Sequence, residues 1–84
     1  TRLMANELAG QGICINAIAP GYMATDNTAQ LRADEARNKA ILDRIPAGRF
    51  GTPADCAALA VLVCSESGGY INGAELAVDG GLAL

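Results

Sequence analysis

Asn16-Ala17-Ile18-Ala19-Pro20-Gly21-Tyr22-Met23-Ala24-Thr25-Asp26 is the stretch that decides the fold of this chain. The run from Cys14 to Ala19 is apolar with one polar interruption, which is typical of a strand covered on both faces. Pro20 lacks an N–H and is expected to end the strand, and Gly21 lets the backbone turn tightly or approach a ligand. Ligands of open α/β sheets bind outside the carboxyl ends of the strands, so this abrupt strand end is a candidate site.

The segments on either side of this stretch predict helices and strands in alternation. Thr1 to Gly10 has apolar residues at helical spacing, and Gly10 is the expected C-cap of that helix. A strand over Ile13 to Ala19 follows, and a last strand is predicted over Ala74 to Asp79, where Asp79 closes the strand end. Helix, short turn and strand together form the second half of a β-α-β crossover.

The segment from Asp26 to Ile45 is charged and helix-prone, with few apolar positions. Thr25 or Asp26 could cap its start. A helical excursion directly after a ligand-facing strand end is the kind of element that opens and closes over a substrate. A solvated surface helix without a lid role explains the same pattern equally well.

A second helix begins at Thr52-Pro53-Ala54-Asp55, where Thr52 is the N-cap and Pro53 occupies the tolerated first position. It is expected to run to about Cys64 and is apolar on every side, which indicates burial against a sheet and against a neighbouring helix or subunit. Arg49 and Asp55 flank this helix start, and we interpret both as structural.

The composition indicates part of a larger unit. The 84 residues are 51% hydrophobic and contain ten glycines, no Trp and no His. A domain of this size buries only about 60% of the surface of its unfolded chain, so its core would be thin if it stood alone. The chain also begins within a helical pattern, without an N-cap. We therefore expect residues 1–84 to be the C-terminal segment of one domain whose N-terminal part is absent.

Charge and cysteine content narrow the classes of function. A net charge of -3 from mixed acidic and basic residues argues against nucleic acid as a partner. The longest apolar run, Cys56 to Cys64, is far shorter than a membrane span needs, so we expect no membrane association and a cytoplasmic protein. With no histidine and no C-x-x-C spacing, we expect no metal site, and we interpret Cys14, Cys56 and Cys64 as small buried hydrophobes.

Four motifs in this order resemble the C-terminal third of a short-chain dehydrogenase/reductase. They are Asn16-Ala17-Ile18-Ala19-Pro20-Gly21 followed by Thr25, Gly48-Arg49-Phe50-Gly51-Thr52-Pro53-Ala54-Asp55, Tyr70-Ile71-Asn72-Gly73 and Val78-Asp79-Gly80-Gly81. Each motif is weak alone, but the set covers nearly the whole chain. The resemblance implies an α/β fold, namely the C-terminal part of a doubly wound Rossmann-type parallel sheet with helices on both faces.

The same resemblance implies the roles of individual residues. It places Pro20, Gly21, the Met23 backbone and the Thr25 hydroxyl at the nicotinamide end of a bound cofactor. A backbone N–H beside a threonine hydroxyl suits the carbonyl and amide of a nicotinamide carboxamide, although Thr25 could also be a simple helix cap. Tyr22 and Asn27 face the same region and are weaker candidates for substrate contact.

The segment from Ala17 through Asp55 most resembles family members that act on deoxy-gluconate-type sugar acids. The implied reaction is hydride transfer between NAD, with NADP not excluded, and a secondary alcohol or ketone of such a small-molecule substrate. A homotetramer is also implied. The family's glycine-rich loop, catalytic Ser and Asn and Tyr-x-x-x-Lys pair have no counterpart in this chain, so no catalytic residue is assigned and the segment alone is expected to be inactive.

Two alternatives remain open on sequence grounds. One is a non-catalytic truncated oligomerisation module, which would have kept the assembly elements and lost the chemistry. The other is an NADPH-dependent 3-ketoacyl-type reductase, because the strand end that reads the 2′-phosphate of the cofactor lies outside this chain.

Overall fold

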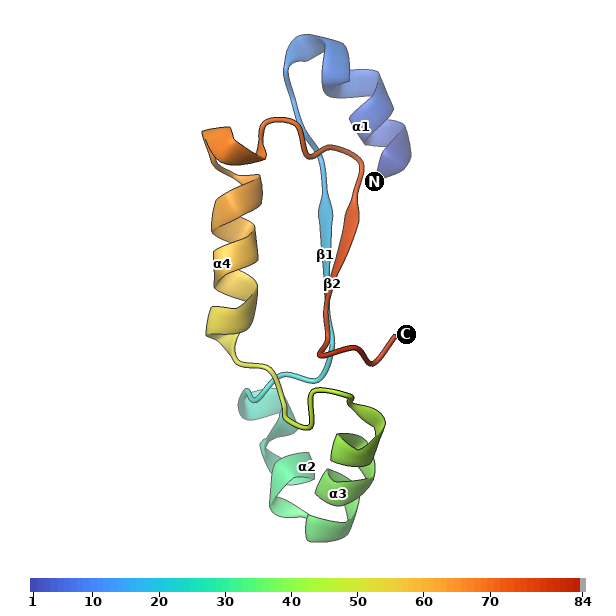
Figure 1. Ribbon diagram of the computed structural model, residues 1–84, viewed down its shortest axis with the longest axis vertical. Coiled ribbons are helices and arrows are strands. Elements are labelled where there is room, and N and C mark those ends of the chain that lie inside the picture. Colours follow the sequence, from blue (N-terminus) through green and yellow to red (C-terminus); the bar gives the residue numbers. More distant parts are fainter. Residues whose placement is uncertain (84) are drawn as a thin grey trace.

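The computed structural model describes residues 1–83; Leu84, the last residue of the expected segment, lies outside this range. The elements in chain order are α1 (Arg2–Leu8), η1 (Ala9–Gln11), β1 (Ala17–Pro20), η2 (Asp26–Thr28), α2 (Ala29–Ala33), α3 (Glu35–Arg44), α4 (Pro53–Val63), η3 (Glu66–Gly68) and β2 (Glu75–Val78). They form an elongated body of 50 × 21 × 19 Å (Figure 1).

The centre of the fold is a parallel pair of strands, in which Ala17 of β1 lies opposite Glu75 and Pro20 opposite Val78 of β2. Helix α4 lies along one side of this pair, and α1 lies on the other side near the start of the strands (Figure 1). The hairpin of α2 and α3 lies beyond the carboxyl ends of both strands. The predicted α/β arrangement with a parallel sheet is therefore confirmed.

β1 ends at Pro20, as the sequence predicts, but Pro20 itself is still paired with Val78 of β2. The Ala17 N–H donates to Ala74 O at 2.9 Å, and the Gly21 N–H donates to Val78 O at 3.0 Å. In a parallel ladder alternate residues donate toward one neighbour. Pro20 falls between two donors, so its missing N–H belongs to the edge that β2 does not use. The strand begins later than predicted, at Ala17, and includes Pro20.

The first helix also ends differently from the prediction. Helix α1 stops at Leu8, a 3₁₀ turn continues to Gln11, and Gly12 adopts the left-handed conformation with φ of 78°. Gly10, the expected C-cap, lies inside the 3₁₀ turn. A left-handed φ is what makes a glycine useful at a helix end, and here that position is two residues further on.

Asp34 divides the predicted helical segment 26–45 into two helices. Its backbone is extended, and its side chain accepts a hydrogen bond from the Arg37 N–H at 3.2 Å, so it is the N-cap of α3. Thr25 precedes η2 with an extended backbone, as a cap residue does. The predicted capping role of Thr25 is confirmed.

The start of α4 matches the sequence signals closely. Thr52 is the N-cap, Pro53 is the first helical residue, and Asp55 lies in the first turn. The Asp55 carboxylate accepts hydrogen bonds from the Thr52 N–H at 2.7 Å and from the Thr52 hydroxyl at 3.1 Å. Directly after β2 (Glu75–Val78), the Asp79 carboxylate accepts a hydrogen bond from the Gly81 N–H at 2.9 Å, which confirms the role of Asp79 in closing this strand end.

Few apolar side chains are buried within residues 1–83, where Ala5 and Ile45 are the buried hydrophobic residues. Helix α4 packs on β1 but leaves Val61 69% exposed and Leu62 41% exposed. Its expected burial on more than one side is therefore not met inside this chain, because no second layer covers the outer face of α4.

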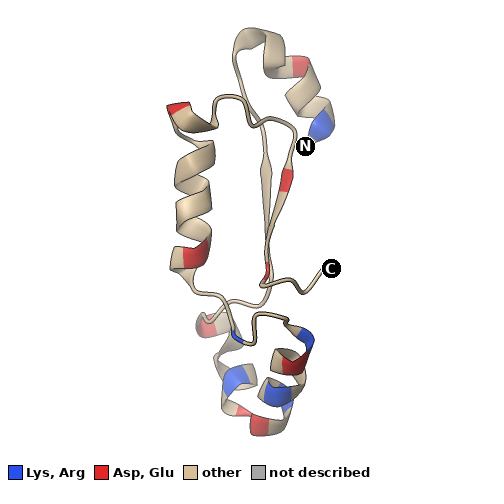
Figure 2. Cartoon of the chain, in the orientation of Figure 1, with Lys and Arg blue, Asp and Glu red and all other residues tan. Residues whose placement is uncertain are grey.

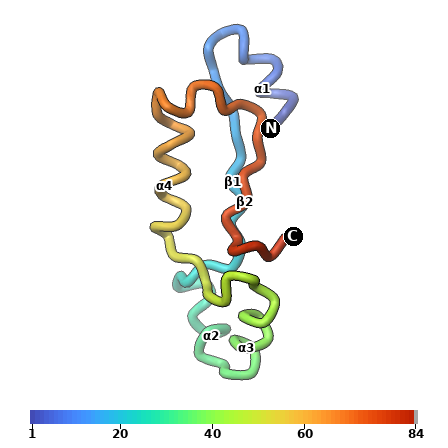
Figure 3. Tube along the Cα trace, viewed as in Figure 1, coloured from blue at the N-terminus to red at the C-terminus, as the bar shows by residue number. Residues whose placement is uncertain are grey.

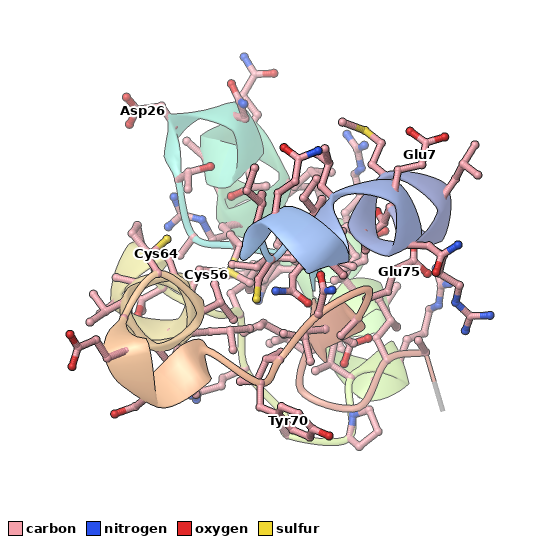
Figure 4. The ribbon with its side chains drawn as sticks, turned by 90° about the horizontal axis from the view of Figure 1, so that it is seen from above. Glu7, Asp26, Cys56, Cys64, Tyr70 and Glu75 are labelled. Carbon is pink, nitrogen blue, oxygen red and sulfur yellow. The ribbon has the colours of Figure 1, made fainter. Side chains whose placement is uncertain are left out.

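The expectation that all three cysteines are buried is wrong for the described part of the chain. Cys14 and Cys64 are exposed and Cys56 is half-buried. Cys56 is in α4 and Cys64 is the C-cap residue of the same helix, and both are labelled in Figure 4. Cys14 lies in the connection before β1, where its thiol donates to Gly69 O at 3.4 Å.

The charged side chains are unevenly placed (Figure 2). Of the six Lys and Arg residues, those on the α2–α3 hairpin are Arg32, Arg37, Lys39 and Arg44. Within residues 1–83, no group of three or more His, Cys, Asp or Glu side chains is arranged to hold a metal ion. The described helices are all too short or too polar to cross a membrane.

Candidate nicotinamide-end site

The candidate site is the turn segment, residues 21–28, which leaves the carboxyl end of β1. Gly21 lies directly against β2, since a Cβ built on it would be 2.6 Å from Asp79 Cβ and 2.8 Å from Asp79 Cα. Real Cβ atoms do not approach backbone atoms this closely, so glycine is required for the close approach of the two strand ends.

The loop that precedes α4 pairs with the turn segment. The Gly51 N–H donates to Tyr22 O at 2.9 Å, and the Ala24 N–H donates to Gly51 O at 2.7 Å. These bonds form a short parallel bridge between Met23 and Gly51. Figure 3 shows the path from α3 into α4 passing the ends of both strands, where the Ala47 N–H also donates to Gly80 O at 2.9 Å.

The backbone carbonyl of Met23 is hydrogen-bonded, whereas its backbone N–H is not, within the described part of the chain. Its carbonyl accepts the Thr25 N–H at 3.1 Å and also the Thr28 hydroxyl. In the bridge to Gly51 the hydrogen bonds are made by the neighbouring residues Tyr22 and Ala24, so the Met23 N–H has no acceptor among residues 1–83. The turn segment therefore presents the Met23 N–H to a ligand, alongside the N–H groups of Tyr22, Asp26 and Asn27, which also have no acceptor among residues 1–83.

A cleft of about 290 Å³ lies beside the turn segment. Its lining comes from the turn segment, the loop before α4 and the end of β2, and consists of Tyr22, Met23, Ala47, Arg49, Gly51, Asp55, Ala77, Val78, Asp79, Gly80 and Gly81. The Tyr22 ring packs edge-on against Phe50, with centroids 6.1 Å apart and planes at 79°. This aromatic contact fixes Tyr22 at the cleft.

An ion pair borders the same cleft. Arg49 Nη1 lies 2.9 Å from Asp55 Oδ2, and Arg49 Nη2 lies 3.3 Å from Asp55 Oδ1. The Arg49 guanidinium, together with the Thr52 groups that donate to the carboxylate, holds the pKa of Asp55 well below its ordinary value of 3.8. Because Asp55 also caps α4, stabilisation of the start of this helix is enough to explain these contacts.

The structure brings some of the predicted site residues together and leaves others apart. Tyr22 and Met23 line the cleft, while Pro20 and Gly21 lie directly behind it at the strand end. Thr25 and Asn27 do not line it; Thr25 is half-exposed and Asn27 is exposed on η2. Their roles toward a cofactor or a substrate stay predictions.

Sequence reasoning did not anticipate Thr28 or Gly51. The spacing of Thr25 and Thr28 is a capping-box spacing, and it could have identified Thr28. Nothing local connects Met23 with Gly51, because the chain passes through two helices between them. That contact became visible only in three dimensions.

Comparison with known proteins assigns the chain to a family. A family model described as enoyl-(acyl carrier protein) reductase matches residues 1–83. The chain belongs to the short-chain dehydrogenase/reductase family. A 2-dehydro-3-deoxy-D-gluconate 5-dehydrogenase of Dickeya dadantii is 62% identical over 81 residues, which are 96% of this chain and 32% of the relative.

Solved structures of short-chain dehydrogenase/reductase proteins superpose closely on it. One, proposed to be a 2-deoxy-D-gluconate 3-dehydrogenase from Agrobacterium tumefaciens, was solved with bound NADP and is 59% identical, with a TM-score of 0.94. The match covers 99% of this chain and 34% of that one. A 4-hydroxyisoleucine dehydrogenase complexed with NADH has the same TM-score at 28% identity, covering 98% of this chain and 34% of that protein.

These matches show that the chain corresponds to part of a larger fold in its relatives. The chain spans about a third of the length of the relatives it matches. Its strand pair and helices are the C-terminal part of a doubly wound Rossmann-type sheet, as the motifs predicted.

Proposed function

We propose that residues 1–84 are the C-terminal segment of a single NAD(P)-binding domain in an oxidoreductase. Its reaction is hydride transfer between a nicotinamide cofactor and a secondary alcohol or ketone of a deoxy-gluconate-type sugar acid. The identity of 62% to a dehydrogenase named for such a sugar acid supports this substrate class. The neighbours solved with NADP and with NADH support the cofactor class, and a choice of NAD over NADP stays a prediction.

The observation that carries the proposal is the free Met23 N–H in a turn segment that also presents Thr25. A nicotinamide carboxamide has one carbonyl that needs a donor and one amide that needs an acceptor. The Met23 N–H would donate to the carbonyl, and the Thr25 hydroxyl would accept from the amide. Gly21, without a Cβ, lets the end of β1 pack against Asp79 and so sets where the turn segment leaves the strand. The residues present therefore fit the group.

The bound nicotinamide supplies the hydride acceptor or donor, and this segment supplies orientation. Two hydrogen bonds to the carboxamide fix which face of the ring meets the substrate. Neither tyrosine of the chain is followed by Lys four residues later, so the proton-transferring residues belong to another part of the protein. We expect the isolated segment to be inactive for this reason.

Tyr22 and Asn27 are proposed to contact the small-molecule substrate. Tyr22 is supported by its place on the cleft wall and by its contact with Phe50. Asn27 is supported only by its position on η2, two residues after Thr25. The α2–α3 hairpin, beyond the strand ends, has the position of a substrate lid.

The test is replacement of Thr25 by Val in the intact natural protein, with NADH binding followed by nicotinamide fluorescence. Val keeps the shape of Thr and removes the hydroxyl, so NADH affinity should fall by about 5- to 10-fold, the loss expected for one ligand hydrogen bond. Ser67→Ala is the matched control, because Ser67 is exposed on η3 and makes no hydrogen bond with the described residues. Equal NADH affinity of T25V and the natural protein would argue against this site.

An NADPH-dependent 3-ketoacyl-type reductase is the alternative activity. The NADP bound in the 59% identical neighbour favours NADPH as the cofactor, as this alternative requires. Turnover of a deoxy-gluconate-type acid and of a 3-ketoacyl thioester, each with NADH and NADPH, separates the two activities.

A homotetramer is the proposed assembly, and a cytoplasmic location is part of the same proposal. The exposed Val61 and Leu62 on α4 and the fully exposed Tyr70 leave apolar surface that a neighbouring subunit would cover. The alternative is a truncated, non-catalytic oligomerisation module. Intact mass separates these: a chain of family length that binds NADH supports the enzyme, and a natural chain of 84 residues without NADH binding supports the module.

A further inference from the structure

The hydroxyl of Thr28 uses its full hydrogen-bonding capacity to hold the turn segment. It donates to Met23 O, and it accepts from the Thr25 N–H at 3.2 Å and from Arg32 Nε at 3.3 Å. A threonine hydroxyl has one donor and two acceptor positions. All three are therefore occupied, and two of them involve the residues that flank Ala24.

Arg32 adds a second and independent contact. Its Nη2 donates to Thr25 O at 3.0 Å, while its Nε contacts Thr28. Helix geometry explains this reach, because Thr28 is the N-cap of α2, Arg32 follows one turn later, and a side chain on a helix leans back over the preceding turn. The planar guanidinium spans both acceptors with fixed geometry, which a lysine cannot do.

These contacts occupy the carbonyls of Met23 and Thr25, so the turn segment presents the Met23 N–H and the Thr25 side chain. We propose that Arg32 and Thr28 form a positioning clamp that fixes the direction of the Met23 N–H and thereby the affinity for nicotinamide. The clamp rests on the proposed function of the turn segment. Neither clamp residue touches the cofactor; both act through Met23 and Thr25.

The clamp connects the turn segment to the α2–α3 hairpin. Arg32 belongs to α2, which is part of the α2–α3 hairpin beyond the strand ends (Figure 1). Figure 4 shows Asp26, at the start of η2, pointing away from the rest of the molecule. A displacement of α2 away from Thr25 would break the contact of Arg32 with Thr25 O, whereas the contact with Thr28, the N-cap of the same helix, would move with α2. The clamp thus couples the position of the hairpin to the geometry that the cofactor meets.

The experiment compares NADH with ADP-ribose, which is the cofactor without nicotinamide, as ligands of the intact protein. ADP-ribose 2′-phosphate replaces ADP-ribose if NADPH is the cofactor. Arg32→Gln should weaken NADH binding by about 5- to 10-fold and change ADP-ribose binding by less than about twofold, because the lost charged hydrogen bonds act only on the nicotinamide turn. A variant that merely destabilised the protein would weaken both ligands alike.

Matched variants separate geometry from charge. Arg37→Gln removes the same charge from the same hairpin, but the Arg37 side chain makes no hydrogen bond within residues 1–83, so NADH affinity should stay unchanged. Arg32→Lys should bind NADH with an affinity between those of R32Q and the natural protein. Thr28→Ser should retain affinity within about twofold, and Thr28→Val should lose about tenfold.

Three results would overturn the inference. They are NADH affinity in R32Q equal to that of the natural protein, an equal loss of ADP-ribose affinity, or an equal effect of R37Q. Failure of the proposed function would look different: the natural protein itself would bind neither NADH nor NADPH, and the clamp proposal would then fall with it.

Discussion

Asn16 and Asn72 each hydrogen-bond to the segment that carries the other. Asn16 Nδ2 donates to Ile71 O at 2.9 Å and its Oδ1 accepts from the Ala74 N–H at 3.0 Å, while Asn72 Oδ1 accepts from the Ile15 N–H at 2.8 Å. Asn72 Nδ2 also lies 3.5 Å from Ala5 O, which links α1 to the same place. The pair joins the entries of β1 and β2 before the backbone ladder begins.

Replacement of Asn72 by Ala should lower the free energy of unfolding of the intact protein by about 1 kcal/mol, because it leaves the Ile15 N–H without its acceptor. Asn16→Ala should have a similar effect. The measurement is urea unfolding, with Asn38→Ala as the control, since the Asn38 side chain makes no hydrogen bond among the described residues. A loss in N72A no greater than in N38A would contradict the prediction.

Gly21→Ala should destabilise the protein by about 1–3 kcal/mol, as overpacking does. The added Cβ would meet Asp79 Cβ and Cα, and neither neighbour is the far end of a flexible side chain. Gly10→Ala is the matched control, because a Cβ at Gly10 meets nothing within 4 Å. G10A should be neutral or slightly stabilising by thermal melting. An unchanged melting temperature in G21A would show that the strand ends separate easily.

The Arg49–Asp55 pair predicts a specific dependence of stability on pH. The folded-state pKa of Asp55 lies below its ordinary value of 3.8, so its contribution is fully present above that value and is lost as pH falls toward the folded pKa. Asp55→Asn should therefore lower the melting temperature at pH 7, and the difference from the natural protein should shrink below about pH 4.

Asp43→Asn is the control for this pH series. Asp43 pairs with Lys39 at 2.7 Å, but both side chains are mostly exposed, and such pairs contribute little. A difference between D55N and the natural protein that stayed constant from pH 7 to pH 3 would assign the effect to the cap geometry of α4 and not to the charge of Asp55.

The isolated 84 residues are expected to unfold without a sharp transition. The buried hydrophobic residues of the described chain are Ala5 and Ile45, and β1 has a partner on one edge within residues 1–83. Thermal melting followed by circular dichroism measures this, with the intact protein as the control. A cooperative transition in the isolated segment would disprove the expectation.

Local chemistry was sufficient to predict some elements of this fold. The start of α4 follows from Thr52, Pro53 and Asp55, because a cap, a fixed φ and a first-turn acid all act within one turn of helix. The last strand was predicted over 74–79 and lies at Glu75–Val78. Motif order was sufficient for the family, since each motif lies at a strand end or a helix start.

Contacts between distant segments could not be predicted in the same way. Whether Pro20 interrupts the hydrogen bonds between β1 and β2 depends on which edge of β1 is occupied by β2. The sequence of β1 does not contain that information. The bridge of Met23 to Gly51 and the reach of Arg32 to Thr25 depend on how two helices fold back. The predicted burial of all three cysteines is wrong for residues 1–83, and burial of the outer face of α4 by a neighbouring subunit stays a prediction.

Because the ribosome makes the chain from its N-terminus, β1 is synthesised before the residues of β2 that pair with it. The Gly21 N–H bonds to Val78 O, so this bond joins the turn segment to a residue that is synthesised much later. At about 5–20 residues per second, the ribosome needs about 3–11 s to pass from Gly21 to Val78. Throughout that interval the turn segment lacks this bond. A nonsense mutation just before Val78 would therefore leave every residue of the turn segment in the product and still remove its bond to β2.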